Sequence, residues 1–186
     1  MSIPAAGPDR EGALDPPERS EAIFGGHVVD LRVSYYRRPD GRSVRREVLD
    51  HPGAAVVVPV HDGHVHLVRQ PREAIERLTL ELPAGKFDES GEEPLECARR
   101  ELAEEIGMRA AHWTHWGGFF TAPAILTEYM HLYLARDLSL AEGAEPDEDE
   151  QIEVVRWPLV ELDALIARVE DAKTLIGLLR LRAHGA

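Results

Sequence analysis

Short segments of alternating apolar and polar residues dominate the first part of the chain, and this is the pattern of half-buried β-strands. The segments and their intervening turns are 27–38 and 42–50 around Pro39-Asp40-Gly41, and 54–60 and 64–70 around Asp62-Gly63. Asp-Gly between apolar runs is a strong hairpin signal, and Pro-Asp-Gly is a typical turn sequence. The pattern therefore predicts two β-hairpins, with the fold proper starting near Ile23.

A helical pattern follows between Pro94 and Gly107. Proline is favoured in the first turn of a helix and glycine just past its end. An apolar stripe is predicted at near-helical spacing, with the neighbouring glutamates off it, at Leu95, Ala98, Leu102 and Ile106. Further strands are expected at 78–86, 112–120, 128–135 and 151–157, and helices from Pro158 to about Val169 and over 171–183. Hairpins with a central helix and terminal helices predict an α+β fold, or a mixed-sheet sandwich.

Length and composition limit the class of protein. A chain of 186 residues suits one domain, which we expect over 21–186 after a disordered tail at 1–20. A net charge of -13 argues against nucleic acid or an anionic membrane as the main partner. Cys97 is the single cysteine, which excludes an intrachain disulfide, and we expect it to be a packing residue. No signal-peptide pattern or membrane-spanning run is present, which predicts a cytoplasmic protein.

Three glutamates share one face of the predicted helix, namely Glu101, Glu104 and Glu105. Like charges three or four residues apart repel by a few tenths of a kcal/mol per pair. A solvated surface is the usual explanation for one such glutamate, but it suits three together less well. Hard divalent cations need oxygen ligands, and carboxylates one helical turn apart can converge on them. The nine histidines show no zinc-hydrolase spacing, so we expect them on the surface or in strands.

Residues 85–108, GKFDESGEEPLECARRELAEEIGM, resemble the signature of the Nudix hydrolases. In that signature a Gly and then a Glu precede the run Arg-Glu-aliphatic-x-Glu-Glu-x-Gly-aliphatic. Six residues separate Gly85 from Glu92 here, whereas the usual pattern has five. The resemblance implies an α/β/α sandwich, with a mixed sheet between helices and an N-terminal antiparallel hairpin region. It also implies hydrolysis of a nucleoside diphosphate linked to another group.

The same resemblance assigns roles to the matching residues. Glu101 and Glu105 would be the core Mg²⁺ ligands, with Mn²⁺ or another divalent cation as alternatives. The backbone carbonyl of Ala84 would be a further ligand, and Glu104 a ligand or close support. Arg100 would orient the glutamates rather than contact the substrate.

Flanking segments resemble one Nudix branch, the ADP-ribose pyrophosphatases. By that resemblance Arg72 contacts phosphate, and Arg46 lies near the adenine with Arg45 as its competitor. Pro123 matches a proline of that branch, although Ala124 stands where glycine is usual. An acidic loop is expected at 142–150, where Glu148 is the expected catalytic carboxylate and Glu150 a further metal ligand. Glu128 is a third candidate for metal or water contact.

Three functions remain open at this stage. The first is a Mg²⁺-dependent pyrophosphohydrolase that cleaves ADP-ribose to AMP and ribose 5-phosphate. The second keeps the enzyme class but acts on another nucleoside diphosphate sugar or nucleotide. The third is a non-catalytic nucleotide-sugar sensor, which the intact carboxylate pattern argues against. The branch also implies a homodimer in which strands at about 23–50 form the interface.

Overall fold

The computed structural model describes residues 14–27, 29–87, 91–141 and 151–185. The chain forms two compact units. The first contains the described residues up to Gly53 together with Phe120–Tyr129, and the second contains Ala54–Phe119 and the residues from Met130 onward. Residues 1–13 of the expected tail lie outside the described residues. The single domain at 21–186 stays a prediction.

The first unit is built on a three-stranded antiparallel sheet of β1 (Arg19–Gly25), β2 (Asp30–Arg37) and β3 (Ser43–Asp50), in that order. The predicted hairpin of β2 and β3 is confirmed, with paired residues from Asp30↔Asp50 to Arg37↔Ser43. The pattern did not predict β1, which starts inside the expected tail. All seven of its residues are exposed, so pairing with β2, rather than burial of a face, holds this strand.

The second unit contains a seven-stranded mixed sheet. Its strands are β4 (Ala54–His61), β5 (His64–Arg72), β6 (Arg77–Glu81), β7 (Ala84–Lys86), β8 (Met108–Phe120), β9 (Tyr129–Leu140) and β10 (Glu153–Pro158). The order is β10-β5-β4-β9-β8, with β6 paired to β5 and β7 paired to β4. β4 runs parallel to β9 but antiparallel to β5 and β7. The predicted second hairpin and the mixed sheet are both confirmed.

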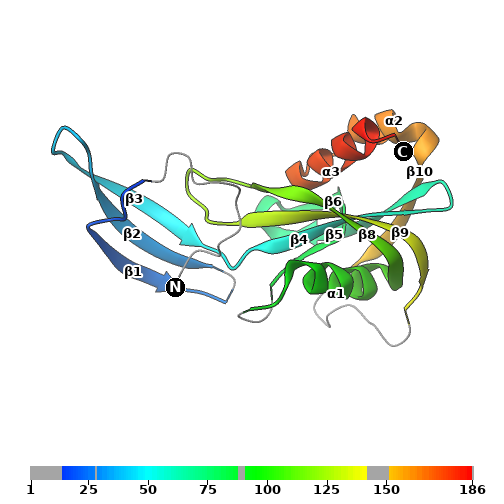
Figure 1. Ribbon diagram of the computed structural model, residues 1–186, viewed down its shortest axis with the longest axis horizontal. Helices are drawn as coiled ribbons and strands as arrows, with labels where there is room; N and C mark the ends of the chain where they lie inside the picture. The colour runs from blue at the N-terminus through cyan, green and yellow to red at the C-terminus, as the bar shows by residue number, and fades with distance from the viewer. Residues whose placement is uncertain (1–13, 28, 88–90, 142–150, 186) are drawn as a thin grey trace. The chain divides into compact units, whose positions relative to one another are not determined.

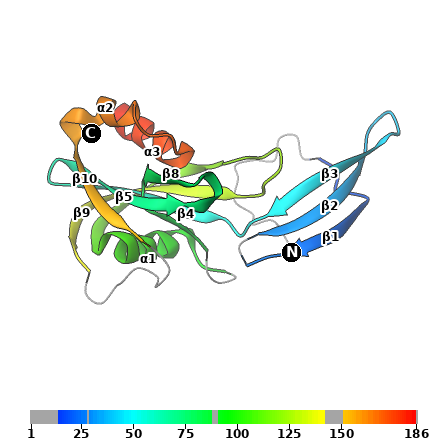
Figure 2. The same ribbon diagram turned by 180° about the vertical axis from the view of Figure 1, so that it is seen from behind.

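Helices cover both faces of this sheet (Figures 1 and 2). α1 (Pro94–Ile106) lies on one face, and α2 (Leu162–Ile166) and α3 (Ala172–Ala183) lie on the other. A separate apolar cluster fills each interface. The cluster under α1 includes Val57, Val68, Ala98 and Leu102, and the cluster under α2 and α3 includes Val56, Leu67, Leu165 and Leu178. This layering confirms the sandwich of a mixed sheet between helices.

The ends of α1 agree with the sequence prediction, whereas the start of the C-terminal helices does not. Gly107 follows α1 with a φ of 72° and donates its N–H to the carbonyl of Ala103. Pro158, expected to begin a helix, is instead the last residue of β10 and pairs with His64. A single turn at Leu159–Glu161 then leads into α2. Pairing with β5 extends the strand through Pro158, although proline is typical of the first turn of a helix. No helix in the described part of the chain is long and apolar enough to cross a membrane.

His66 is the least expected residue of this core. It lies on β5 with 2% of its surface exposed, and within the described residues neither ring nitrogen has a hydrogen-bond partner. Burial, together with the charge of Arg156, lowers the pKa of His66 from 6.5 to about 4. The imidazole is therefore neutral in the folded state at neutral pH.

This histidine predicts an acid-sensitive fold. Below pH 6.5 the unfolded chain binds a proton at His66, whereas the folded chain binds it only near pH 4. The free energy of unfolding therefore falls as the pH is lowered across that window. At pH 5 the loss is about 2 kcal/mol relative to pH 7.5. Urea unfolding at both pH values should show this loss in the wild type and in His112→Leu, where the histidine is exposed. His66→Leu should show a loss smaller by about 2 kcal/mol, with a remainder from His131, whose pKa is also lowered by burial. An equal loss in all three proteins would refute the assignment.

Candidate functional site

The acidic face of α1 is buried rather than solvated. Glu101 and Glu105 are 8% and 3% exposed, as buried as the apolar residues of the same helix. Glu104 is partly exposed. The helical pattern predicted all three glutamates off the buried stripe, which is wrong for Glu101 and Glu105. They are buried because the backbone of β7 lies against this side of the helix.

Arg100 offsets the repulsion between these carboxylates. Its Nη1 donates to Glu101 Oε1 at 2.6 Å and to Glu104 Oε2 at 3.0 Å. Its Nε donates to Glu92 at 3.2 Å, and its Nη2 donates to the carbonyl of Lys86 at 3.0 Å. Hydrogen bonds between ionised groups are stronger than neutral ones, so a single guanidinium fixes three carboxylates. Glu92, despite the extra residue before it, lies within this network.

The backbone of β7 contacts the carboxylates of Glu105 and Glu101. The N–H of Ala84 donates to Glu105 Oε2 at 3.0 Å. The next residue, Gly85, packs so closely on α1 that a Cβ there would overlap the carboxylate of Glu101. A glycine is required at this position because of that close approach, and any larger residue would displace Glu101.

The donors gathered here suit a hard divalent cation. The side chains available here are the carboxylates of Glu101, Glu104 and Glu105 on α1, and Glu105 contacts the backbone of Ala84, so every candidate metal-ligating atom is oxygen. Among the described residues, no three acidic, histidine or cysteine side chains converge closely enough to form a finished metal cage. Arg100 engages the oxygens of Glu101 and Glu104 instead. The chemistry of the set fits the ion, and Arg100 would have to share those oxygens with it.

A buried ion-pair cluster holds Arg72 at the end of β5. The Nε and Nη2 of Arg72 donate to the two oxygens of Glu81 at 2.8 and 2.7 Å, and Nη1 takes no part in this pair. Lys173 of α3 and the hydroxyl of Thr79 also donate to Glu81, which is 1% exposed. Burial alone would raise the pKa of Glu81, but Arg72 and Lys173 lower it to about 2. The charge of Glu105 is among those that raise the pKa of Arg72.

Sequence reasoning missed Glu81 and Lys173. They are 92 residues apart, and only the packing of α3 beside β6 brings them together. The available signal was an acidic residue inside the apolar run LTLEL, since charged residues are almost never fully buried unless they are paired.

Lys173→Met should destabilise the fold by about 3 kcal/mol, because removing one partner of a buried ion pair leaves the other charge poorly compensated. Urea unfolding at pH 7 measures this change. The control is Arg182→Met on the same helix, which breaks an exposed pair with Asp163 and should cost less than about 1 kcal/mol. Equal effects of the two substitutions would show that the Glu81 cluster contributes nothing beyond a surface ion pair.

The other predicted site residues lie in the first unit or outside the described residues. Arg46 is exposed on β3 and donates to the carbonyl of Arg45, whose own side chain pairs with Glu47. Pro123 and Glu128 also belong to the first unit. There Glu128 accepts a hydrogen bond from Thr121 at 2.6 Å and lies 3.4 Å from His51. Glu148 and Glu150 lie outside the described residues.

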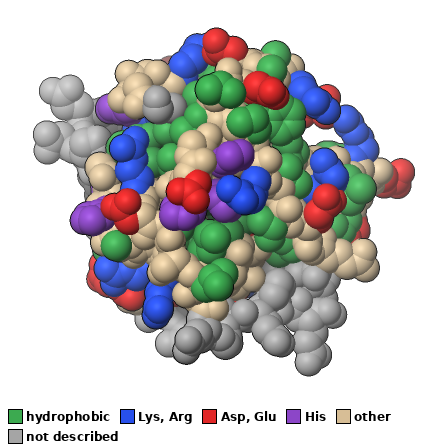
Figure 3. Space-filling view, turned by 90° about the vertical axis from the view of Figure 1, so that its right-hand side faces the viewer, with side chains coloured by type: hydrophobic (Ala, Val, Ile, Leu, Met, Phe, Trp, Pro, Cys, Tyr) green, Lys and Arg blue, Asp and Glu red, His purple; other side chains and the backbone are tan. Residues whose placement is uncertain are grey.

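Cys97 and the histidines form no further site of this kind. Cys97 is fully buried under α1, and burial raises the pKa of its thiol to about 12, which confirms the packing role. Several histidines gather on the face shown in Figure 3, mixed with acidic, basic and apolar side chains. His61 and His64 flank the β4–β5 turn and contact Asp62 through its carboxylate and its carbonyl, respectively.

Known proteins share this fold and motif. Residues 50–178 match the family model described as NUDIX domain. An "ADP-ribose pyrophosphatase" of Bacillus subtilis (strain 168) is 44% identical over 158 residues, covering 83% of this chain and 85% of that protein. A "Methanol dehydrogenase activator" of Bacillus methanolicus is 37% identical over 172 residues, covering 90% and 92%.

A solved structure gives the same result at the level of the fold. "Crystal structure of ADP compounds hydrolase" superposes with a TM-score of 0.80 at 26% identity, covering 93% of this chain and 98% of that one. The matched domain includes the whole of α1 and the β7 backbone against which its glutamates pack. The resemblance seen in residues 85–108 is thereby confirmed, and the chain belongs to the Nudix family.

Proposed function

We propose that this chain is a Mg²⁺-dependent pyrophosphohydrolase that cleaves the diphosphate of ADP-ribose into AMP and ribose 5-phosphate. The observation that carries the proposal is the buried pair of Glu101 and Glu105, held by Arg100 and by the backbone of β7. Relatives named "ADP-ribose pyrophosphatase" support the substrate. One is the Bacillus subtilis protein, and another, from Mycobacterium tuberculosis (strain ATCC 25618 / H37Rv), is 35% identical over 158 residues.

Nudix hydrolases generally use divalent cations, usually Mg²⁺. Glu101, Glu105 and the carbonyl of Ala84 would hold the ion here, with Glu104 and Glu150 as further ligands and Mn²⁺ as an alternative metal. When bound, the ion would polarise phosphoryl oxygens and lower the pKa of a coordinated water.

The remaining residues orient the reactants. Arg100 keeps the carboxylates of Glu101 and Glu104 in place, and it does so from beside the site rather than through the substrate. Arg72 is anchored to Glu81 through two of its nitrogens, which leaves Nη1 for a phosphate oxygen. Arg46 is proposed to lie near the adenine, and Pro123 to shape the substrate-binding loop.

Hydrolysis needs one proton transfer. We assign the general base to Glu148, with Glu128 as the alternative. The base takes a proton from water as the water oxygen attacks phosphorus, and the bond to the bridging oxygen breaks. The departing phosphate leaves with that oxygen, so one water is consumed and two phosphomonoesters are formed.

A related substrate is the second candidate. An "ADP compounds hydrolase NudE" of Escherichia coli (strain K12) and a "GDP-mannose pyrophosphatase" of Cronobacter sakazakii (strain ATCC BAA-894) are each 35% identical to this chain. These names support hydrolysis of another nucleoside diphosphate sugar or nucleotide at the same carboxylates. A non-catalytic sensor is disfavoured, since binding alone does not require the complete carboxylate set.

We also propose a homodimer with residues 23–50 at its interface. Ile23 and Phe24 of β1 are 55% and 61% exposed, and exposed apolar side chains on an edge strand favour association. Light scattering after size exclusion should give twice the mass of 20.7 kDa, and a monomeric mass would contradict the proposal.

The substrate is tested by incubating the protein and Mg²⁺ with ADP-ribose, other nucleotide sugars, dinucleotides and nucleoside triphosphates, and separating the products by chromatography. AMP and ribose 5-phosphate should form from ADP-ribose faster than products form from any other compound. Faster hydrolysis of another compound would identify that compound as the substrate and leave the enzyme class unchanged. Binding without turnover of any compound would favour the non-catalytic sensor over the enzyme.

A further inference from the structure

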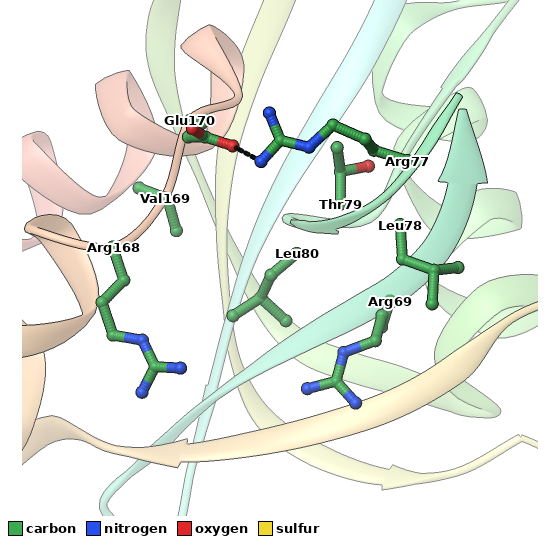
Figure 4. Close-up of a pocket in the computed structure, with 8 residues that line it drawn as sticks. All are labelled: Arg69, Arg77, Leu78, Thr79, Leu80, Arg168, Val169 and Glu170. Atoms are coloured by element: carbon green, nitrogen blue, oxygen red, sulfur yellow. Dashed lines mark hydrogen bonds and ion pairs between the residues drawn. The ribbon is translucent and has the colours of Figure 1, made fainter. Parts of the chain in front are cut away.

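A basic site lies between β5, β6 and the segment that joins α2 to α3. It is a pocket of about 230 Å³ in the second unit. Its lining consists of Arg69, Arg77, Leu78, Thr79, Leu80, Arg168, Val169 and Glu170 (Figure 4). Three arginines and one glutamate line it, in a protein whose net charge is -13. We call it the arginine pocket.

The three arginines come from three separate segments, and their present partners are weak. Arg77 pairs with Glu170 at 2.5 Å and Arg69 with Glu153 at 2.8 Å, and both pairs are exposed. Exposed ion pairs contribute about 0–1 kcal/mol, so an incoming dianion can replace the carboxylates. Within the described part of the chain, Arg168 has no carboxylate at ion-pair distance, and its guanidinium lies 5.3 Å from the ring centre of Trp157.

The floor of the pocket is apolar. Figure 4 shows the side chain of Leu80 between Arg168 and Arg69, with Val169 beside it. Both Leu80 and Val169 pack against the cluster under α2 and α3. Apolar surroundings strengthen the attraction between a guanidinium and an anion, and they offer contact to an uncharged part of a ligand. Thr79 also lines the pocket, with its hydroxyl donated to Glu81.

Size and charge together define the ligand. Guanidinium groups bind phosphate through paired hydrogen bonds, and the arginines exceed the acidic residues of the lining. A volume of about 230 Å³ has room for more than an inorganic phosphate but is below the usual range of ligand pockets, about 300–1,000 Å³. We propose that the arginine pocket binds a small phosphomonoester, with its phosphate on the arginines and its organic part on Leu80 and Val169.

This site is separate from the candidate active site. The lining includes no residue of α1 or β7, and it does not include Arg72. The proposal therefore does not depend on the function proposed above. It predicts anion binding that survives when the candidate active site is altered.

Calorimetric titration of metal-free protein with ribose 5-phosphate tests the proposal, since this probe carries one phosphate on a small organic group. We expect saturable binding to the wild type. Arg168→Gln and Arg69→Gln should each weaken it at least tenfold. Arg182→Gln and Arg99→Gln, each at an exposed ion pair elsewhere, should bind like the wild type. Unchanged thermal unfolding would verify that each variant is folded.

Two further probes separate the contributions of the phosphate group and of the organic group to the affinity. Ribose without phosphate should not bind, and inorganic phosphate should bind more weakly than ribose 5-phosphate because it lacks the contacts to the floor. The absence of saturable binding to the wild type would overturn the proposal. So would unchanged binding in Arg168→Gln and Arg69→Gln, or equal affinity for inorganic phosphate and the monoester.

Discussion

Glu105→Gln is expected to lower kcat for ADP-ribose hydrolysis about 10³-fold while leaving the protein folded. The substitution removes a negative charge from the proposed metal site but keeps the shape of the side chain and an oxygen for the N–H of Ala84. A metal ligand contributes several kcal/mol to transition-state stabilisation, and about 4 kcal/mol corresponds to a factor of 10³. Initial rates at saturating ADP-ribose and Mg²⁺ measure the effect.

The matched control is Glu96→Gln on the same helix. Glu96 is exposed and pairs with Arg99, so its loss removes the same charge from α1 without touching the buried face. It should retain nearly full activity. If Glu105→Gln kept most of its turnover, the ligand assignment would fail. If both variants lost activity equally, the loss would reflect the overall charge of the helix rather than a ligand at Glu105.

Gly85→Ala is expected to reduce kcat by about 10²-fold with little loss of stability. The new Cβ would overlap the carboxylate of Glu101, which must move away from its place beside Arg100. A carboxylate is the far end of a flexible side chain, so the fold can adapt, but the ligand is no longer where the reaction needs it. Misplacement by about 1 Å at a catalytic site costs about 10²-fold in rate.

Both the activity and the thermal unfolding of Gly85→Ala are measured. Gly25→Ala serves as the control, because the nearest atom to its added Cβ would be Asp30 Oδ1 at an ordinary contact distance of 3.6 Å. The expected pattern is an unfolding temperature near that of the wild type, with activity lost in Gly85→Ala alone. Full activity in Gly85→Ala would mean that the observed position of Glu101 is not needed for turnover.

The local patterns in the sequence were sufficient for α1 and the hairpins. Proline and glycine bracket α1, and Asp62-Gly63 sets the turn between β4 and β5, so neighbouring residues determine these elements. The Nudix motif likewise lies within one continuous segment. The carboxylates of α1 could therefore be proposed as a group before their surroundings were known.

Features that depend on distant pairing could not be predicted in the same way. β1 exposes all its residues and exists through its pairing with β2, and Pro158 continues β10 because β5 lies beside it. The burial of Glu101 and Glu105 depends on β7, which precedes α1 in sequence and packs against it. The Glu81–Lys173 pair joins β6 to α3 over a separation of 92 residues. Each is a tertiary contact with no periodic signal of its own.

Arg100 answers the question raised by the acidic helix. Three glutamates on one face would repel, and the sequence suggested that a bound cation offsets this cost. The structure shows that an arginine of the same helix engages Glu101 and Glu104, together with Glu92 upstream. The glutamates are thus held in place before any ion binds, and such preorganisation favours catalysis because little rearrangement is left for the reaction.

The central claim is that the buried carboxylates of α1 support divalent-cation-dependent cleavage of the ADP-ribose diphosphate. Its most direct test is the amount of AMP and ribose 5-phosphate released as Mg²⁺ is added back to wild-type protein freed of metal. The two products should appear in equal amounts, only once Mg²⁺ is present, and with a rate that saturates as the ion is titrated. Turnover without a divalent cation, or products other than this equimolar pair, would contradict the claim.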